Sequence, residues 1–292
     1  MTKTGLAKIE PAADRDIAAG ERFGFGENWS RFLAVLNEDR ILEAEKSLTR
    51  LFGEPGLGSK AGLDGKTFLD VGSGSGLFSL AARRLGATVH SFDFDPQSVA
   101  CARELKRRYF PDDGCWNIEP GSALDREFVA SLGTFDIVYS WGVLHHTGDM
   151  WKGLDVVTEA TRPGGRLCIM IYLDRGFYSV FWRRIKRLYC SGTLGRWIVL
   201  GAFIPYFVVS GFCVDLLRGK SPARRYTEYK RRRGMSKVHD WLDWLGGYPY
   251  EVATPKQLRD FYAERGFQAV TERGQELGYV EILFERDRAQ PE

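Results

Sequence analysis

The sequence predicts an α/β protein built on a mostly parallel sheet with helices on both faces. From residue 66 onwards, short apolar runs alternate with helical segments, and this alternation is typical of βαβ units. A glycine-rich turn follows the first of these runs and leads into a helix, as at the ligand-binding edge of open parallel sheets. The length of 292 residues fits one large domain, or one domain with a sizeable insertion.

The predicted strands are short apolar runs that end at turn residues; they cover 66–71, 87–94, 115–120, 135–141 and 166–173. Helices are expected between them, at 76–86, 96–109 and 149–162. A proline at the first helical position favours the second of these helices, and the sequence Pro-Gly-Gly is expected to stop the third.

A closing unit follows after residue 250. Thr254 is suited to the N-cap of a helix and Pro255 to its first position, and two strand-like runs follow at 267–274 and 279–286. We therefore expect one α/β domain formed by residues 63–175 and 251–288, with residues 176–250 inserted after the fifth strand.

The segments before this domain are predicted to be a flexible tail at 1–20 and an N-terminal helical lid at 21–62. The tail lacks the apolar stretch of a secretory signal. The five cysteines are widely spaced and include no C-x-x-C pair, so neither a disulfide framework nor a metal site is expected. These features predict a cytoplasmic protein.

The composition excludes several classes of protein. With 44% hydrophobic and 27% charged residues, the chain can bury a core, unlike disordered, collagen-like or rod-like chains. The net charge of +3 is too small to indicate a general nucleic-acid binder. Arg175 to Lys237 nevertheless holds 15 Lys and Arg against two acidic residues, so the positive charge is local.

The turn after the first strand has the sequence Gly-Ser-Gly-Ser-Gly, with Asp70 before it and Gly72, Gly74 and Gly76 in it. Glycines let a backbone approach a ligand closely, and a helix N-terminus attracts anionic or polar groups. Asp93 ends the second strand, where a carboxylate can accept both hydroxyls of a ribose. Neither G-x-G-x-x-G nor a Walker motif is present, so the expected ligand is a nucleoside without a diphosphate.

Four motifs together resemble the class I S-adenosylmethionine-dependent methyltransferases, over about residues 64–173. They are DVGSGSG with Asp93, GSAL at 121–124, FDIVYSWGVLHH at 135–146 and RPGG at 162–165. The resemblance implies a Rossmann-like, seven-stranded sheet with an antiparallel last strand and S-adenosyl-L-methionine as cofactor. It implies cofactor contacts from Asp70, Gly72, Ser73, Gly74, Gly76, Asp93, Phe94, Ser122, Ala123, Ser140 and Trp141, and from Asn28 and Trp29 in the lid.

Three histidines are candidates for catalysis. His145 and His146 lie on the loop after the fourth strand, which faces the reactive end of the expected cofactor. Either one acts as a general base or orients the acceptor, or both cap the loop through hydrogen bonds. His239 begins an aromatic and acidic stretch that forms either a substrate pocket or an aromatic cluster holding the insertion to the domain.

The insertion contains an uncharged run of 18 residues, Trp197–Val214. Basic residues flank it on both sides and Pro205 lies within it, which argues against a membrane-spanning helix. The alternatives are an apolar substrate lid, a homodimer contact, or an in-plane contact with an anionic membrane surface that would make the protein membrane-peripheral. Each favours a lipophilic acceptor.

We therefore predict a methyltransferase acting on a small-molecule acceptor, with no specific nucleic-acid partner. One alternative is an RNA-modifying enzyme that grips RNA with the basic insertion. The sequence SWGV after the fourth strand differs from the N/D-P-P-Y pattern of base-amino methyltransferases, which counts against it. The other alternative is a non-catalytic scaffold that binds the cofactor.

Overall fold

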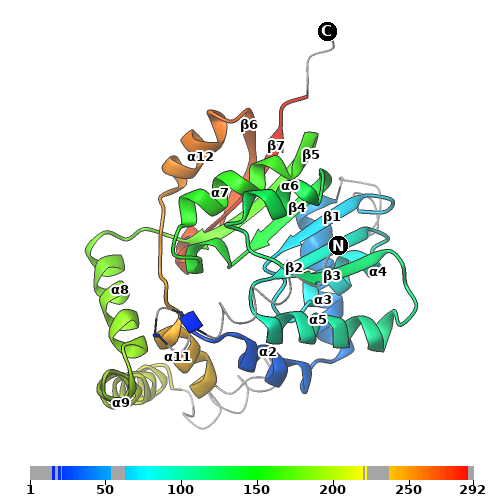
Figure 1. Cartoon of the computed structure of the whole chain (residues 1–292). Coiled ribbons are helices and arrows are strands. Elements are labelled where there is room, and N and C mark those ends of the chain that lie inside the picture. The colour runs from blue at the N-terminus through cyan, green and yellow to red at the C-terminus, as the bar shows by residue number, and fades with distance from the viewer. Residues whose placement is uncertain are drawn as a thin grey trace.

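The computed structural model describes residues 15–16, 19–20, 22–53, 63–219, 221 and 237–288 (Figure 1). Its centre is a single seven-stranded sheet with the order β3-β2-β1-β4-β5-β7-β6. The strands are β1 (Thr67–Val71), β2 (Thr88–Asp93), β3 (Trp116–Pro120), β4 (Phe135–Trp141), β5 (Thr161–Tyr172), β6 (Phe267–Arg273) and β7 (Tyr279–Arg286). The first five pair in parallel, and β7 runs antiparallel to both β5 and β6. The predicted fold class is confirmed.

Helices cover both faces of the sheet (Figure 1). One core packs side chains of α3 (Glu38–Phe52), α4 (Leu77–Arg84) and α5 (Pro96–Tyr109) on one face. The other core uses α6 (Arg126–Ser131), α7 (Met150–Glu159) and α12 (Pro255–Ala263). The central strands are thus buried on both sides, which explains why they appear in the sequence as nearly continuous apolar runs.

Local signals place several helix starts. Asp95 caps α5 by accepting a hydrogen bond from the backbone N–H of Gln97. Thr254 and Gln257 form a reciprocal capping box on α12, with Pro255 at the first helical position. The predicted cap at Thr254 is confirmed, and it satisfies backbone donors that the first helical turn would otherwise leave unpaired.

One strand boundary was predicted wrongly. The expected helix through Arg162 ends at Glu159, and β5 already begins at Thr161, so the Pro-Gly-Gly segment lies inside the strand. Phe135 of β4 pairs with Thr161, and the register then shifts before Ile137 pairs with Arg166. Gly164 takes a positive φ of 72° in this irregular stretch. The glycines therefore accommodate an irregularity within the strand and do not terminate the helix.

Three described helices lie between β5 and α12: α8 (Phe177–Cys190), α9 (Thr193–Leu217) and α11 (Lys237–Gly246). Together they form a third core around Trp182, Val199 and Leu245. The helix α9 continues through Pro205 without a break. Most of the basic run after Lys220 lies outside the described residues.

Two further elements position the site. The helix α2 (Gly26–Leu33) precedes α3, and the short 3-10 helix η1 (Leu144–His146) follows β4. A second 3-10 helix, η2 (Gln275–Leu277), joins β6 to β7. Residues 1–14 of the predicted tail and 54–62 of the predicted lid lie outside the described residues.

Candidate functional site

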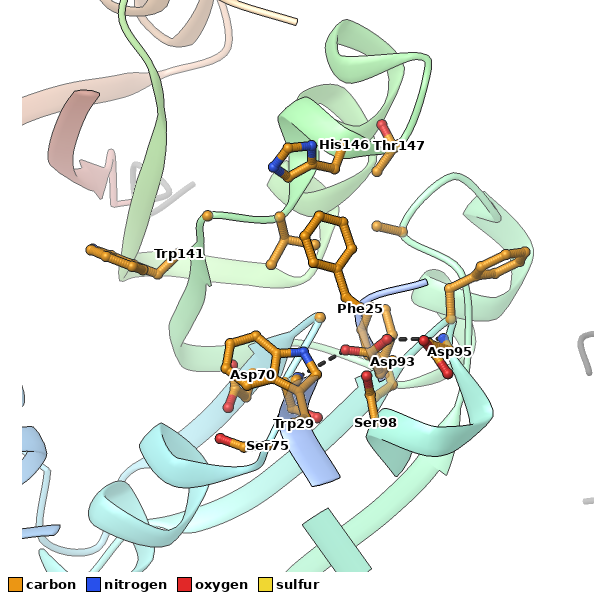
Figure 2. Close-up of a pocket in the computed structure, with 18 of the residues that line it drawn as sticks. Phe25, Trp29, Asp70, Ser75, Asp93, Asp95, Ser98, Trp141, His146 and Thr147 are labelled. Atoms are coloured by element: carbon orange, nitrogen blue, oxygen red, sulfur yellow. Dashed lines mark hydrogen bonds between the residues drawn. The ribbon is translucent and has the colours of Figure 1, made fainter. Parts of the chain in front are cut away.

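A cavity of about 540 Å³ lies at the carboxyl ends of β1, β2 and β4 (Figure 2). The glycine turn and the end of β2 form one part of its wall. Residues of β4, β5, η1, α2, α4 and α11, and of the segments before α2 and after β3, also line it. This is where parallel α/β sheets bind their ligands. Its size also lies in the range of small-molecule sites.

The glycine turn depends on backbone conformations that other residues rarely adopt. Gly72 and Gly74 have φ values of 72° and 54°. The N–H groups of Gly72 and Ser73 both donate to the Phe92 carbonyl of β2, and a Cβ on Gly72 would overlap the Val143 side chain. Glycine at position 72 is therefore required by both conformation and space.

Gly76 has a different environment from the one expected. It is not among the cavity-lining residues, and a Cβ there would lie 2.8 Å from the Cα of Ala102. Gly76 therefore allows α4 and α5 to pack closely. It supports the turn without forming part of the cavity wall.

The Asp93 carboxylate lines the cavity and is held by backbone donors. Its Oδ2 accepts from the N–H of Gly74 at 2.8 Å and its Oδ1 from the N–H of Asp95 at 2.9 Å. Burial raises the pKa of Asp93 to about 6, although these two hydrogen bonds oppose the shift. Each carboxylate oxygen has a second lone pair, so Asp93 can accept further hydrogen bonds from a ligand.

Asp70 is a second buried carboxyl group in the cavity wall. Its Oδ2 accepts a hydrogen bond of 2.5 Å from the Ser79 hydroxyl. Burial raises the pKa of Asp70 to about 7, and the nearby Asp93 adds to the rise. Two carboxyl groups thus stand beside the same glycine turn.

Three of the residues that the family resemblance implies as cofactor contacts lie together in the cavity wall. Phe94, Ser122 and Ala123 all line it. The guanidinium group of Arg22 lies 4.6 Å from the centre of the Phe94 ring. Sequence analysis did not single out Arg22, because it lies in a charged stretch with no motif around it.

Ser140 and Trp141, two neighbouring residues that the resemblance implies as cofactor contacts, have different positions in the structure. Trp141 lines the cavity, and its Nε1 donates to Glu281 of β7 at 2.9 Å. Ser140 is buried, is absent from the cavity wall, and has no hydrogen-bond partner for its hydroxyl among the described residues. Successive side chains of a strand point to opposite faces, so β4 directs only one of the pair into the cavity.

The helix α2 covers the glycine turn, as Figure 2 shows for Trp29. A Cβ on Gly74 would lie 2.9 Å from the Trp29 ring, and the N–H of Gly26 donates to Asp95 at 2.9 Å. The Phe25 ring lies 5.0 Å from that of His146. The side chain of Asn28 lies outside the described part of α2.

The two histidines of η1 have different environments. The Nδ1 of His146 donates to the Pro249 carbonyl at 2.6 Å, and the ring lines the cavity. Burial lowers the pKa of His146 to about 3, and nearby Lys186 and Arg22 lower it further. His146 is therefore neutral at neutral pH, with its proton on Nδ1 and a lone pair on Nε2.

His145 also lines the cavity, but its side chain is fully buried and neither ring nitrogen has a hydrogen-bond partner among the described residues. Its ring lies 4.1 Å from that of Tyr172. Burial lowers the pKa of His145 well below its ordinary value. The hypothesis that the loop histidines act as hydrogen-bonding caps does not describe this side chain.

The end of the stretch that begins with His239 forms hydrogen bonds with η1 and with the start of α7. The N–H of Glu251 donates to the His145 carbonyl at 3.0 Å, and the Glu251 carboxylate accepts from the N–H of Met150 at 2.9 Å. Together with the Pro249 contact, these bonds hold η1 and the start of α7. No sequence pattern indicates these roles of Pro249 and Glu251, because their partners lie about a hundred residues earlier in the chain.

The aromatic residues of this stretch mainly form a cluster. Tyr250 is buried in the third core, whereas Trp244 packs there and also lines the cavity. His239 lies in α11, but its side chain is outside the described part of the structure. The aromatic cluster and the cavity wall therefore meet at Trp244.

Comparisons with known proteins agree with this geometry. Residues 69–167 match a family model described as a methyltransferase domain. A tRNA U34 carboxymethyltransferase from Klebsiella pneumoniae is 35% identical over 201 residues, covering 64% of this chain and 57% of the relative. A ubiquinone biosynthesis O-methyltransferase from a Methylobacterium species is 27% identical over 177 residues, covering 59% and 62%. The chain thus spans about half the length of the curated relatives it matches.

Two solved structures share the fold. An O-methyltransferase family protein from Burkholderia thailandensis gives a TM-score of 0.51 at 13% identity, covering 86% of this chain and 59% of that one. Magnesium protoporphyrin IX methyltransferase from Synechocystis, solved with bound SAH, gives 0.51 at 12% identity, covering 89% and 95%. Together with the strand order, they show that this chain has the fold of the class I S-adenosylmethionine-dependent methyltransferases, and residues 69–167 match the methyltransferase-domain model within it.

Proposed function

We propose that this chain transfers a methyl group from S-adenosylmethionine to a small, lipophilic acceptor. One observation carries the proposal: a buried carboxylate beside a glycine turn opens onto the same cavity as an aromatic wall containing a neutral histidine. The first feature suits a nucleoside, and the second suits an apolar molecule that must lose a proton.

The residues present fit the cofactor. Asp93 has lone pairs for ribose hydroxyls, and Phe94, Ser122 and Ala123 line the same cavity. The hydroxyl of Ser73, in the turn itself, is buried without a partner among the described residues, which leaves it available to a ligand. We assign further contacts to Asp70, Gly72, Gly74, Trp29 and Trp141, and a supporting role to Gly76 and Ser140.

The cofactor, when bound, supplies a methyl group already activated by a positively charged sulfur. The protein then has to align the acceptor, exclude water and remove a proton where the acceptor carries one. Trp29 and Phe25 close the cavity against solvent. We assign proton removal to Nε2 of His146, since its Nδ1–H is committed to the Pro249 carbonyl.

The rest of the cavity wall favours an apolar acceptor. Phe23, Met170, Tyr172 and Trp244 line the side beyond His146. Among the described lining residues, Arg22 is the one with a permanently cationic side chain, and it lies near Asp93 and Asp95. An acceptor carrying a carboxylate would thus lack a free cationic partner in the cavity. A carboxymethyl group also carries a carboxylate, so the lack of a free cation favours methyl over carboxymethyl transfer.

The first experiment measures cofactor binding by titration calorimetry. Asp93→Ala removes a charged acceptor worth about 1.5–3 kcal/mol per hydrogen bond, so affinity for S-adenosylmethionine should fall at least about tenfold. Asp125→Ala is the matched control, because Asp125 caps α6 outside the cavity. Equal affinity in the wild type and Asp93→Ala would refute the nucleoside site.

RNA is a second candidate acceptor. It is favoured by the tRNA-modifying relative and by the basic stretch from Arg175 to Lys237. The protein should be incubated with a methyl-labelled donor and either total tRNA or a lipid-soluble extract. We expect label in the extract; label in tRNA would overturn the small-molecule assignment.

We also propose a cytoplasmic location. All five cysteines are free thiols, and free thiols persist in a reducing compartment. Fractionation of cells producing the tagged protein would test this, since recovery in a secreted fraction would contradict it.

A further inference from the structure

The helix α9 has two faces with different surroundings. On its inner face, Gly195, Val199, Gly211 and Asp215 are buried. Phe203 and Phe207 continue this stripe and pack, half-buried, against the third core together with Leu200 and Ile204. A Cβ on Gly195 would overlap the Leu188 carbonyl of α8. The helix is therefore an integral part of the folded layer.

The outer face of α9 is apolar as well, yet uncovered. Trp197 is 68% exposed, Val209 59% and Leu217 88%, and Leu194, Ile198, Tyr206 and Phe212 are exposed with them. The neighbouring α8 adds Phe177, Phe181 and Leu188. Only 11% of the most apolar stretch of α9 is buried. Contiguous apolar surfaces of this kind mark interaction sites, and Figure 1 shows α8 and α9 at the periphery, away from the sheet.

The same surface is bordered by positive charge. Arg184 is exposed on α8, and Arg218 stands at the C-terminal end of α9. Arg187 lines a second hollow with Glu251, and Arg196 lies 5.3 Å from the centre of the Tyr189 ring. Within the described ranges, no carboxylate pairs with Arg184, Arg187 or Arg218. An apolar face with unpaired cations at its margins complements a surface that is apolar inside and anionic at its rim.

We propose that the outer face of α8 and α9 docks in the interface of an anionic lipid bilayer, with α9 lying parallel to the membrane plane. Trp197 and Tyr206 would lie at headgroup level, where aromatic rings with a polar edge are favoured. The arginines would meet the lipid phosphates. This proposal does not depend on the identity of the acceptor.

The packing of α9 argues for an in-plane position over a membrane-spanning one. A spanning helix is surrounded by lipid, whereas the inner stripe of α9 contacts protein and includes the buried carboxyl group of Asp215. Removing these contacts would place a carboxyl group in hydrocarbon. The basic residues at both ends of the helix also fit an in-plane orientation better than a spanning one.

A second copy of the chain is a poorer occupant. A two-fold contact places the same patch on both sides, so it would bring Arg184 and Arg218 of one protomer near those of the other. An anionic bilayer neutralises these charges. The layer also adjoins the cavity: Trp182 of α8 lies 5.5 Å from Trp244 of α11, which lines it.

The test is vesicle flotation of the full-length protein. Vesicles of phosphatidylcholine alone are compared with vesicles containing phosphatidylglycerol, at low and high salt. The test variant combines Trp197→Glu with Val209→Glu. The matched control combines Val270→Glu with Leu277→Glu, two exposed apolar residues on β6 and η2 that are 52% and 76% exposed. Calorimetry with S-adenosylmethionine checks that both variants are folded.

We expect the wild type and the control to float with anionic vesicles, to bind neutral vesicles at least about tenfold less, and to detach at high salt. The test variant should lose at least about tenfold in bound fraction while keeping its cofactor affinity. No flotation of the wild type at low salt overturns the proposal. Equal flotation of both variants also overturns it, as does a lipid-free dimer that only the test variant dissociates.

Resistance of the bound protein to an alkaline carbonate wash would overturn the in-plane orientation, because such a wash leaves spanning helices in the membrane. If the protein showed no preference for anionic vesicles and tRNA displaced it from them at low salt, the basic residues at the margin would be assigned to RNA binding. Loss of cofactor binding in the wild type would instead refute the methyltransferase proposal and leave docking intact. The two proposals thus fail separately.

Discussion

The central sheet and the layer formed by α8, α9 and α11 bury apolar side chains in different ways. Leu69, Val138 and Ile169 in the sheet are fully buried, because helices cover both of its faces. In α9, a stripe at every fourth residue is buried or half-buried and Leu200 and Ile204 pack beside it, whereas the remaining apolar side chains are exposed. The sheet therefore has both of its apolar faces covered by helices of this chain. The layer leaves an apolar face exposed to water, and such a face is typical of an interaction site.

Buried charge shows the same contrast. Asp93 at the sheet edge is held by two backbone N–H donors. Lys186 of α8 is buried in the layer, where its Nζ donates to the Trp244 carbonyl and lies 4.1 Å from the centre of the Trp244 ring. Burial lowers the pKa of Lys186 to about 7 and raises that of Asp93 to about 6. Each shift favours the neutral form.

The largest effect on stability is expected from Lys186. Its pKa in the folded state, about 7, is below the ordinary value of 10.5, so the unfolded chain binds the extra proton between these values. The stability associated with Lys186 is then present above pH 10.5 and is lost as the pH falls towards 7. Lys186→Met removes the penalty, so the variant should be the more stable at pH 7. Its advantage should shrink by about 1.4 kcal/mol per pH unit as the pH rises towards 10.

Urea denaturation of the wild type and Lys186→Met at several pH values measures this difference. Comparing the two proteins cancels the titration of tyrosines and cysteines that they share. Lys152→Met is the control, since Lys152 is exposed on α7 and the same replacement there removes no buried cation. A constant difference between the wild type and Lys186→Met would mean that Lys186 stays solvated and charged, and the contrast with the sheet would disappear.

The next effect concerns His146, which follows strand β4 of the sheet and donates to Pro249, which follows helix α11 of the layer. His146→Gln keeps a donor for the Pro249 carbonyl but cannot accept a proton from the acceptor. We expect kcat to fall about 100-fold, as for loss of a general base, with unchanged affinity for S-adenosylmethionine. His90→Gln is the matched control, because His90 lies in β2 and contacts Glu119 away from the cavity.

Steady-state rates with the acceptor found in labelling experiments provide this measurement. Protonation of His146 is not expected to reduce the rate until the pH approaches its pKa of about 3. A kcat for His146→Gln close to that of the wild type would leave His146 with a structural role only.

The features that depend on local sequence patterns could be predicted, whereas those that depend on contacts between distant segments could not. The strands, the cap at Thr254 and the glycine turn are local patterns, and the structure has them where they were predicted, apart from the start of β5. Strand alternation implies that Ser140 and Trp141 point to opposite faces. The sequence could not show which of the two lines the cavity, or that Gly76 serves helix packing, because both depend on neighbours from other elements. Nor could it assign the partners of His146 and Glu251, which come from segments far apart in the chain.

The exposed face of α9 was equally beyond sequence analysis. A helix that is apolar on every side has no periodic difference between its inner and outer faces. The run Trp197–Val214 therefore fitted a lid, a subunit contact and a membrane contact alike. Only the packing of Val199, Phe203 and Phe207 in the third core identifies the inner side.

A smaller effect separates two reasons why the turn requires glycine at position 72: the positive φ of the backbone and the lack of room for a side chain. Ala at Gly133 meets no atom within 4 Å, although its φ of 81° disfavours a side chain, so Gly133→Ala should cost about 1–2 kcal/mol of unfolding free energy. Gly72→Ala has a similar φ but also overlaps Val143, which should add about 1–3 kcal/mol. Urea denaturation measures both. Equal losses would show that Val143 moves aside and that the turn is less tightly packed than the sheet beneath it.

The smallest effect concerns how helices begin in the two regions. Thr254 of α12 accepts from the N–H of Gln257, whose side chain accepts from the N–H of Thr254. By contrast, α8 and α9 begin after Gly176 and Gly192, which have no capping side chain. Thr254→Ala should therefore lower the unfolding free energy by about 1 kcal/mol, and Thr254→Ser should retain most of it. If urea denaturation showed the two variants to be alike, the start of α12 would depend on its buried Leu258 and Tyr262, and packing would govern helix starts in both regions.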